Sequence, residues 1–288
     1  MNKRPIGNVL VLNERALPSG GRFLIVGDIH GELEMLERVL VAAQYDESRD
    51  ILISAGDLID RGPSSAEVVK FFVDHPRRLA ILGNHEGYPL EASGIPHLSM
   101  NWMAEGGAWA LLETPDDLQR MVAALKQFPL GMELILENSN RRVGIVHGEV
   151  PVGSSWDDLY RLDLDRDDMT GIMFSEARAW LSGRHRIKAA ALAHSWREHP
   201  DVSSLFDDDE MKTSGIDLVI SGHSIMPHRR PYRSGNQLWI DTGAFEHKRG
   251  GRLTVIDPVE QVYWQTSANE SFGPLSLNDP WIWSLNGR

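Results

Sequence analysis

The order of apolar runs in the first part of the chain limits the folds that it can adopt. Runs at Arg22–Val26, Ile51–Ala55 and Leu79–Leu82 predict three buried strands. Apolar residues at helical spacing predict one helix from Glu32 to about Gln44 and another across Ser64–Val73. Strands that alternate with helices in this way are typical of an α/β sheet with helices packed on its faces.

Strand patterns dominate the second half of the chain, with fewer helices between them. Thr114-Pro115 begins a predicted helix that Pro129 ends, and a further helix is expected around Ile172–Leu181. The remaining apolar runs predict strands at Leu130–Leu136, Arg142–Val146, Asp217–Ser221, Gln237–Ile240, Arg252–Ile256 and Val262–Gln265. There is no internal repeat and no low-complexity linker, so we expect residues 1–288 to form one domain in which two sheets pack together. Its core would span about residues 22–266, and residues 267–288 would form a C-terminal tail.

The composition excludes several classes of protein. The 288 residues include 29 Lys and Arg against 41 Asp and Glu, a net charge of −12 that disfavours general nucleic-acid binding. The chain has no cysteine, which excludes disulfides, thiolate metal sites and a cysteine nucleophile. The apolar patch at Val9–Leu12 is far shorter than the roughly 18 residues of a membrane span. We therefore expect a cytoplasmic protein with no nucleic-acid or membrane partner.

Side chains that can bind metal follow five of the predicted strands. The first three strands each run into a glycine that precedes a carboxylate or an amide, and two later strands end at histidine. The side chains that these strand ends supply are Asp28, His30, Asp57, Asn84, His147 and His223. Because the carboxyl edge of an α/β sheet is where binding sites form, we expect these side chains to lie together.

The residue types also indicate which metals they would bind. Carboxylate, imidazole and amide oxygen without thiolate favour Mn²⁺, iron, Zn²⁺ or Ni²⁺ over Ca²⁺ or Mg²⁺ alone. Six ligands are too many for one tetrahedral ion and suit two ions about 3.5–4 Å apart that share a carboxylate. Taken singly, a Gly-Asp pair is usually a turn, and a histidine after a strand is usually a buried core residue. Five such endings in one chain favour the metal centre.

Five motifs resemble those of one known family. GDIHG at Gly27, GDLIDRGP at Gly56, GNHE at Gly83, HG at His147 and ISGH at Ile220 are similar to the phosphoprotein-phosphatase branch of the calcineurin-like metallophosphoesterases. The resemblance covers about residues 22–257, and the segments WMAEGG and QLWIDTGAF further resemble the phage-lambda-type bacterial serine/threonine protein phosphatases. It implies an α/β fold, the αββα sandwich of two mixed β-sheets flanked by helices. In that family the sandwich holds a dinuclear metal centre, commonly manganese or iron.

The resemblance also implies a role for each ligand. Asp28 and His30 would bind the first ion, and Asp57 would bridge both ions. The second ion would be bound by Asn84, His147 and His223. Mn²⁺ is the expected metal, with iron, zinc and nickel as the alternatives. A hydroxide that bridges the two ions would attack phosphorus in line.

Two residues inside the motifs would carry the catalytic chemistry. The resemblance makes His85 the proton donor to the leaving oxygen, with Asp60 orienting its ring, and imidazole suits this role because it titrates near neutral pH. The simpler alternative is that His85 caps the helix that begins at Glu86. Arg61 would bind the phosphate through its planar fork, the alternative being an ion pair with Asp60. Asn84 would contact the substrate as well.

The family normally adds a second phosphate-binding arginine from the middle of the chain. Arg178, in FSEARAW, is the preferred candidate, followed by Arg161 and Arg184, and for each of them a solvated helix-face arginine is the alternative. The chain also has Glu149 where many relatives have a second glycine after the histidine ligand. This acid would either affect the site or lie in a solvated loop.

Several charged or aromatic segments remain outside these roles. The acidic stretches Asp157–Asp168 and Asp207–Glu210 are most simply solvated loops. At the rim of a cleft they would favour basic peptides, whereas His228-Arg229-Arg230 would favour acidic ones. Trp281 and Trp283 in the tail either pack back onto the domain or contact a partner.

Together these features predict a metal-dependent phosphatase that hydrolyses phosphomonoesters. Phosphoserine and phosphothreonine in a phosphoprotein or phosphopeptide are the expected substrates, with phosphotyrosine as a further one. The alternative is a symmetrical diadenosine tetraphosphate hydrolase, an enzyme that typically lacks the acid found here at Asp60 and carries aspartate at the position of Glu86. A non-catalytic scaffold is disfavoured because every expected ligand position is filled.

Overall fold

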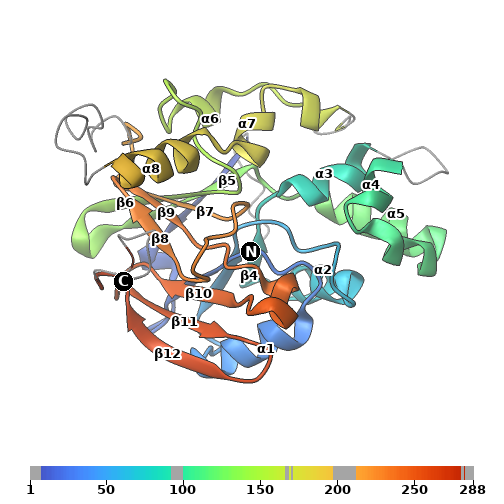
Figure 1. The fold of residues 1–288 in the computed structure, drawn as a ribbon, viewed down its shortest axis with the longest axis horizontal. Coiled ribbons are helices and arrows are strands. Elements are labelled where there is room, and N and C mark those ends of the chain that lie inside the picture. The colour runs from blue at the N-terminus through green and yellow to red at the C-terminus, as the bar shows by residue number, and fades with distance from the viewer. Residues whose placement is uncertain are drawn as a thin grey trace.

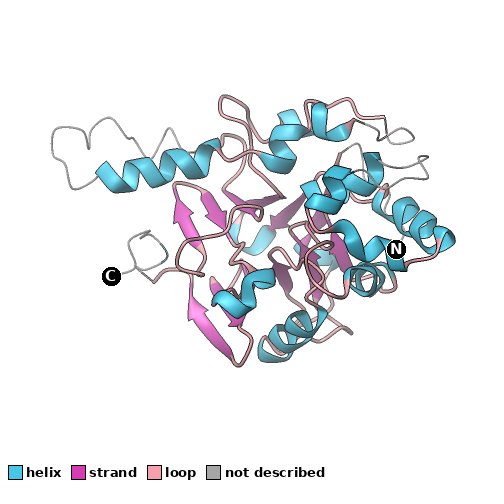
Figure 2. Ribbon diagram, turned by 45° about the vertical axis from the view of Figure 1, so that its right-hand side comes forward, coloured by secondary structure: helices cyan, strands magenta, loops and turns pink. Residues whose placement is uncertain are grey.

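Two six-stranded mixed β-sheets pack face to face at the centre of the computed structural model, with helices on both outer sides (Figure 1). The structure describes residues 8–91, 100–165, 169, 171–196, 212–279 and 282, with the backbone alone at 174 and 193–196. Figure 2 shows the same order of layers, with strands between two groups of helices. The predicted αββα fold class is confirmed.

The first sheet brings together strands from both halves of the chain. Its strands are β1 (Val9–Asn13), β5 (Gly131–Leu136), β6 (Arg141–Val146), β7 (Leu218–Ser221), β8 (Tyr232–Ser234) and β9 (Gln237–Trp239). They lie in the order β1-β5-β6-β7-β9-β8. Because β6, β7 and β9 are parallel, the segments that follow them begin at the same edge of the sheet.

The second sheet combines the first three predicted strands with three from the C-terminal part. Its strands are β2 (Phe23–Val26), β3 (Ile51–Ser54), β4 (Arg78–Ala80), β10 (Leu253–Asp257), β11 (Val262–Thr266) and β12 (Ser271–Ser276). They lie in the order β12-β11-β10-β2-β3-β4. Since β2, β3 and β4 are parallel, the loops after them also share one edge.

Alternate residues of the strands face different layers of the core. Phe23 and Ile25 of β2 belong to the apolar cluster between the sheets, together with Ile220 of β7. Leu24 and Val26 of the same strand belong to the cluster on the outer side. This period of two explains why β2 reads as an unbroken apolar run, since both of its faces are buried.

Helices cover the outer face of each sheet. They are α1 (Leu33–Ala42), α2 (Ser65–Val73), α3 (Asn84–Glu91), α4 (Met100–Ala104), α5 (Pro115–Leu125), α6 (Asp158–Arg161), α7 (Arg178–Ser182) and α8 (His185–Trp196). Helix α1 contacts β10 and β11 of the second sheet, while α6, α7 and α8 lie on the side of the first sheet (Figure 1). No helix in the described part of the chain has both the length and the apolar character that crossing a bilayer requires.

The structure differs from the sequence prediction at one expected helix, at both limits of the core, and in elements such as α8 and β8 that were not predicted. The helix expected around Ile172–Leu181 is wrong: Ile172–Phe174 is a 3₁₀ turn, and α7 begins only at Arg178. Ser175 separates the two pieces, because its backbone is extended and its hydroxyl accepts a hydrogen bond from the Ala177 N–H. Strands β1 and β12 also extend the sheets beyond the predicted core limits of 22 and 266.

Some predictions fall outside the described residues. These are the roles of Trp281, Trp283 and Asp207–Glu210, together with residues 166–168 of the first acidic stretch. The assignment of the whole chain to one domain remains a prediction.

Candidate active site

The six candidate ligands lie in one buried site where the edges of the two sheets meet. The loops after β2, β3 and β4 supply Asp28, His30, Asp57 and Asn84, and the segments after β6 and β7 supply His147 and His223. The backbone N–H of His223 donates to both carboxylate oxygens of Asp28 at 3.0 Å, and Nδ1 of His147 donates to the Ala55 carbonyl at 2.7 Å. Both hydrogen bonds join one sheet to the other, so the site forms across the seam of the sandwich.

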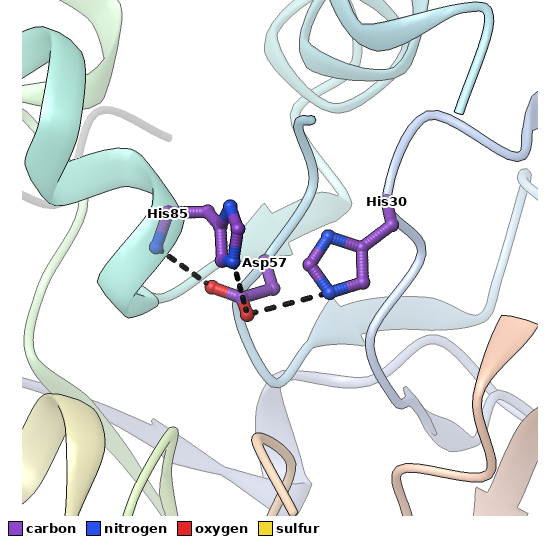
Figure 3. A group of neighbouring side chains, drawn as sticks. All are labelled: His30, Asp57 and His85. Atoms are coloured by element: carbon purple, nitrogen blue, oxygen red, sulfur yellow. Dashed lines mark hydrogen bonds and ion pairs between the residues drawn. The ribbon is translucent and has the colours of Figure 1, made fainter. Parts of the chain in front are cut away.

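Asp57 is at the centre of this site. Its Oδ1 lies 3.1 Å from Nε2 of His147, and its Oδ2 lies 3.6 Å from Nε2 of His30. Figure 3 shows the Asp57 carboxylate between the rings of His30 and His85, which come from different loops. Burial by itself raises the pKa of Asp57, but the neighbouring histidines, led by His147, outweigh burial and hold that pKa well below its usual value. Asp57 is thus the carboxylate that both groups of histidines share.

Backbone carbonyls fix which ring nitrogen faces the centre. Nδ1 of His30 lies 2.9 Å from the Ile59 carbonyl, and Nδ1 of His147 lies 2.7 Å from that of Ala55. A carbonyl only accepts, so in each ring Nδ1 carries the proton and Nε2 is presented to the site, as is usual for metal-binding histidines. Burial lowers the pKa of His30 to about 3, whereas Asp57 and Asp28 overcome burial and raise that of His147 to about 10.

Three buried carboxylates face each other in the site. Burial, followed by the charges of Asp241 and Asp57, raises the pKa of Asp28 well above its usual value. Burial likewise raises the pKa of Asp241 to about 6. Asp241 lies in the DTGAF segment after β9, and the motif pattern of the sequence assigns no role to this acid. Mutual repulsion among buried acids is relieved by cations, which makes this set of groups suitable for metal.

The donor atoms and the space around them fit two divalent cations. His30, Asp57 and His85 form one group, and Asp57, His147 and His223 form another, with the ligand atoms of each group within 4.8 Å of one another. Glycines keep the room open: a Cβ on Gly83 would come within 2.2 Å of Asp57 Oδ1. All donors are nitrogen or oxygen, as iron, manganese and zinc accept. In the structure, His85 belongs to the group of His30 and Asp57. Asp28 lies beside the group of His147 and His223, because its carboxylate accepts a hydrogen bond from the backbone N–H of His223.

His85 and Asp60 form a hydrogen-bonded pair beside the candidate ligands. Nδ1 of His85 donates to Asp60 Oδ2 at 2.7 Å, and Asp60 is fully buried. The other oxygen, Oδ1, accepts from the indole N–H groups of Trp102 and Trp109, both at 2.8 Å. Burial lowers the pKa of His85, but Asp57 and the hydrogen bond to Asp60 outweigh burial and raise it overall. Sequence reasoning missed Trp109, which is 49 residues from its partner.

Arg61 directs its guanidinium into the same space. Nη1 lies 3.2 Å from Nε2 of His30, and Nη2 lies 3.0 Å from Nε2 of His85. The Phe245 ring lies 4.4 Å from the guanidinium carbon, and Glu105 lies 3.6 Å from Nη2. The carboxylate of Asp60 faces His85 and the two tryptophans, so the proposed alternative of an Asp60–Arg61 ion pair does not describe this arrangement. Sequence reasoning also missed Phe245.

Several residues of the site have positive backbone φ angles, which residues other than glycine rarely adopt. Positive φ angles occur at His30 (49°), Asp57 (52°), Asp60 (73°), Arg61 (71°) and His223 (63°). Such angles cost energy in residues other than glycine, and they concentrate at functional sites. Five of them in three short loops indicate that the fold fixes these side chains at an energetic cost.

The arginines of the middle segment lie in different surroundings. Nη2 of Arg184 lies 3.3 Å from the backbone carbonyl of His223, which brings Arg184 to the site. Arg161 pairs with Asp158 at 2.8 Å. Arg178 is exposed at the start of α7, and within the described residues no contact joins its side chain to the site. The assignment of Arg178 to the substrate remains a prediction.

Glu149 does not lie in a solvated loop, and an effect of this acid on the site remains a prediction. It is 2% exposed, and its carboxylate accepts hydrogen bonds from the backbone N–H groups of His185 and Arg186 at 2.9 and 2.7 Å. These are the first two residues of α8, so Glu149 caps that helix at its positive end. Elsewhere, Arg229 pairs with Glu246.

A comparison with protein families places the chain. The family model described as calcineurin-like phosphoesterase matches residues 21–227, which include all six candidate ligands. The chain belongs to the calcineurin-like phosphoesterases. This family uses a dinuclear metal centre, so this phosphoesterase is a metal-dependent enzyme with candidate ligands for that centre in place.

Individual relatives of the phosphoesterase fall into two groups. Serine/threonine-protein phosphatase 1 of Salmonella typhimurium is 39% identical over 234 residues, which cover 80% of this chain and 89% of that protein. Serine/threonine-protein phosphatase 2 of Escherichia coli is 28% identical over 231 residues, with the same coverage of 80% and 89%. A symmetrical bis(5'-nucleosyl)-tetraphosphatase of Nitrosococcus oceani is 33% identical over 135 residues, which cover 46% of this chain and 44% of that protein.

A solved structure agrees with this fold. A serine/threonine phosphatase from Saccharomyces cerevisiae superposes with a TM-score of 0.57 at 16% identity, covering 95% of this chain and 86% of that one. The likeness is one of fold.

Proposed function

We propose that this phosphoesterase removes phosphate from phosphoserine and phosphothreonine in proteins, with phosphotyrosine as a further substrate. The observation that carries the proposal is the His85–Asp60 pair next to Arg61, a proton donor and an anion-binding group beside the candidate ligands. Serine and threonine leave as basic alkoxides, and a proton donor assists their departure. Similarity to two bacterial serine/threonine phosphatases over 80% of the chain supports this substrate class. A cysteine-free chain with such substrates suits the reducing cytoplasm.

The ligand roles in this proposal come from the family motifs, and the closeness of the side chains in one site supports them. As the family motifs imply, Asp28 and His30 would hold one cation, and Asp57, which lies close to His30, would be shared between the two. Asn84, His147 and His223, which lie together, would hold the second cation. The mixture of imidazole, amide and carboxylate favours Mn²⁺, with iron, zinc and nickel as the alternatives. When bound, the two cations supply positive charge that offsets the phosphoryl oxygens and lowers the pKa of water.

The residues around the ligands then bind the phosphate and move a proton. Both terminal nitrogens of Arg61 point into the site, where a phosphate would accept from them in place of the histidine rings. Phe245 packs on the guanidinium and limits its rotation. His85 gives its Nε2 proton to the leaving oxygen as the bond from phosphorus breaks. Asp60 keeps Nδ1 protonated throughout, so only Nε2 exchanges a proton.

The second candidate is hydrolysis of a dinucleoside tetraphosphate. It rests on the Nitrosococcus relative, which matches under half of this chain. Two features favour the phosphoprotein instead. Asp60 is present and hydrogen-bonded to His85. The residue after His85 is Glu86, where the tetraphosphate hydrolases typically carry the shorter aspartate.

A substrate panel tests the proposal. We expect the Mn²⁺-loaded enzyme to release inorganic phosphate from phosphoserine and phosphothreonine peptides with a kcat/KM far above that for diadenosine tetraphosphate. A chelator should abolish turnover, and Mn²⁺ should restore it. His85→Ala should keep both ions but lose about 10²–10⁴ in kcat on phosphopeptides, the usual contribution of general acid catalysis. Faster release of nucleoside diphosphate from the dinucleotide than of phosphate from any peptide would overturn the proposal.

A further inference from the structure

The carboxylate of Asp60 is surrounded by hydrogen-bond donors. Oδ2 accepts from Nδ1 of His85 at 2.7 Å, and Oδ1 accepts from the indole nitrogens of Trp102 and Trp109 at 2.8 Å each. An indole N–H can only donate, so Oδ1 is an acceptor to both and carries no proton. The other oxygen, Oδ2, faces Nδ1 of His85 and accepts from it when the carboxyl group is ionised. The two tryptophan partners thus fix the position of Asp60 and turn its Oδ2 towards His85.

The tryptophans belong to a segment that is built to approach this loop closely. Trp102 lies in α4, and Trp109 lies in the 3₁₀ helix Gly107–Leu112. Between them, the Gly106 carbonyl accepts from the Arg61 N–H at 3.3 Å. A Cβ on Gly106 would come within 2.7 Å of the Arg61 nitrogen, and one on Gly107 within 2.3 Å of the Trp102 ring. Glycine at both positions therefore lets the segment reach the Asp60 loop.

The arrangement resembles a second tryptophan–carboxylate contact with a purely structural setting. The Trp156 indole donates to Glu133 at 2.7 Å, and Glu133 also accepts from Nε and Nη2 of Arg142. Glu133 has no histidine partner among the described residues. The two contacts have the same donor and the same acceptor type. They differ in the other hydrogen-bond partner of the carboxylate, which is Arg142 in one case and the proton donor His85 in the other.

We propose that Trp102 and Trp109 are positioning residues for proton donation by His85. The inference rests on the proposed function in one respect, namely that His85 protonates the leaving oxygen. Water supplies the new oxygen on phosphorus, the electron pair of the broken bond goes to the leaving oxygen, and the Nε2 proton of His85 neutralises it. The two indoles touch neither substrate nor the reacting atoms. They act by keeping Asp60, and through it the His85 ring, aimed at the leaving oxygen.

A leaving-group series tests this role in the Mn²⁺-loaded enzyme. Trp102→Phe and Trp109→Phe each remove one N–H donor and keep an aromatic ring, and Trp156→Phe is the matched control. Loss of one hydrogen bond to a charged group predicts a fall of about 10- to 100-fold in kcat/KM on phenyl phosphate and a phosphoserine peptide. On p-nitrophenyl phosphate, whose leaving group needs little protonation, we expect a fall below about 3-fold. Trp156→Phe should show no dependence on the leaving group.

A double-mutant cycle separates positioning from structural support. In a His85→Ala background, Trp109→Phe should cause no further loss of kcat/KM on phenyl phosphate, because Trp109 affects the reaction only through His85. Metal content and the urea unfolding midpoint of each variant show that it is folded. An equal loss on every leaving group, no loss on any, or an undiminished effect in the His85→Ala background would overturn the inference. The aryl phosphates carry no peptide or nucleotide, so a preference for the dinucleotide would refute the proposed substrate and leave this result intact.

Discussion

Replacing Glu86 with glutamine tests how the fold holds the loop that carries Asp57. The Glu86 carboxylate is fully buried and accepts four backbone N–H bonds. Oε2 accepts from Asp57 at 2.9 Å and from Gly83 at 2.8 Å, while Oε1 accepts from Leu58 at 2.8 Å and from Ile59 at 3.4 Å. One side chain therefore satisfies the donors of two loops that supply candidate ligands.

The expected cost follows from how many of these bonds survive. Glutamine has one acceptor oxygen, so two of the four N–H groups lose their partner and face an NH₂ group instead. A buried N–H without a partner costs about 1–3 kcal/mol, so the free energy of unfolding should fall by about 2–6 kcal/mol. Against a total stability of about 5–15 kcal/mol, this loss is large.

Urea unfolding followed by tryptophan fluorescence measures this cost. The metal-free protein is compared at pH 8, where Glu86 is ionised although burial, followed by the charge of Asp57, raises its pKa to about 7. Because the substitution also removes this buried charge, part of the cost is offset and the low end of the range is expected. Glu67→Gln, the same change at an exposed position of α2, is the control and should leave the midpoint unchanged. A difference below about 1 kcal/mol for Glu86→Gln would show that the carboxylate does not hold the loops, and would refute the reasoning.

Three further predictions address other parts of the molecule. Asp57→Asn should lose bound Mn²⁺, because the amide lacks the charge that offsets two cations. Elemental analysis measures the loss. Two ions per chain in this variant would show that Asp57 is not the carboxylate shared by the two cations. Glu133→Gln should lower the free energy of unfolding by about 2–4 kcal/mol at pH 7. Despite burial, hydrogen bonds led by that of Arg142 lower the pKa of Glu133, so its contribution is complete above the ordinary 4.5 and disappears as acid protonates the folded carboxylate. The variant and wild type should therefore converge in urea titrations near pH 3, and an equal gap at both pH values would contradict this. Arg184→Ala should raise KM for phosphopeptides about 3- to 10-fold with little change in kcat, and a larger rise for Arg178→Ala would return that role to Arg178.

The sequence predicted the strands that carry the site because their signal is local. β2 and β3 are buried on both faces and are followed within two residues by glycine, so the pattern and the ligand positions are visible within a few residues. β12 could not be found in this way. Its residues are mostly exposed and include Gly273-Pro274, and its pairing with β11 comes from the neighbouring strand rather than from its own pattern.

The contacts that support the site could not be predicted from the sequence, because their signal is not local. Trp109, Phe245 and Asp241 acquire meaning only from partners that are far away in the chain, such as Asp60 for Trp109. Glu149 was assessed beside the histidine ligand that precedes it, whereas its hydrogen-bond partners begin a helix 36 residues later. Motif position identified the candidate ligands, but only the fold shows what holds them.

The hydrogen bonds that cross the seam of the sandwich link enzyme turnover to the docking of the two sheets. Asp28 and Ala55 follow strands of one sheet, and His223 and His147 follow strands of the other. If heat separates the layers, the ligand set is dispersed while each sheet still keeps its own backbone pairing. Turnover in a heating experiment therefore reports the docking of the two layers, and circular dichroism reports the integrity of each.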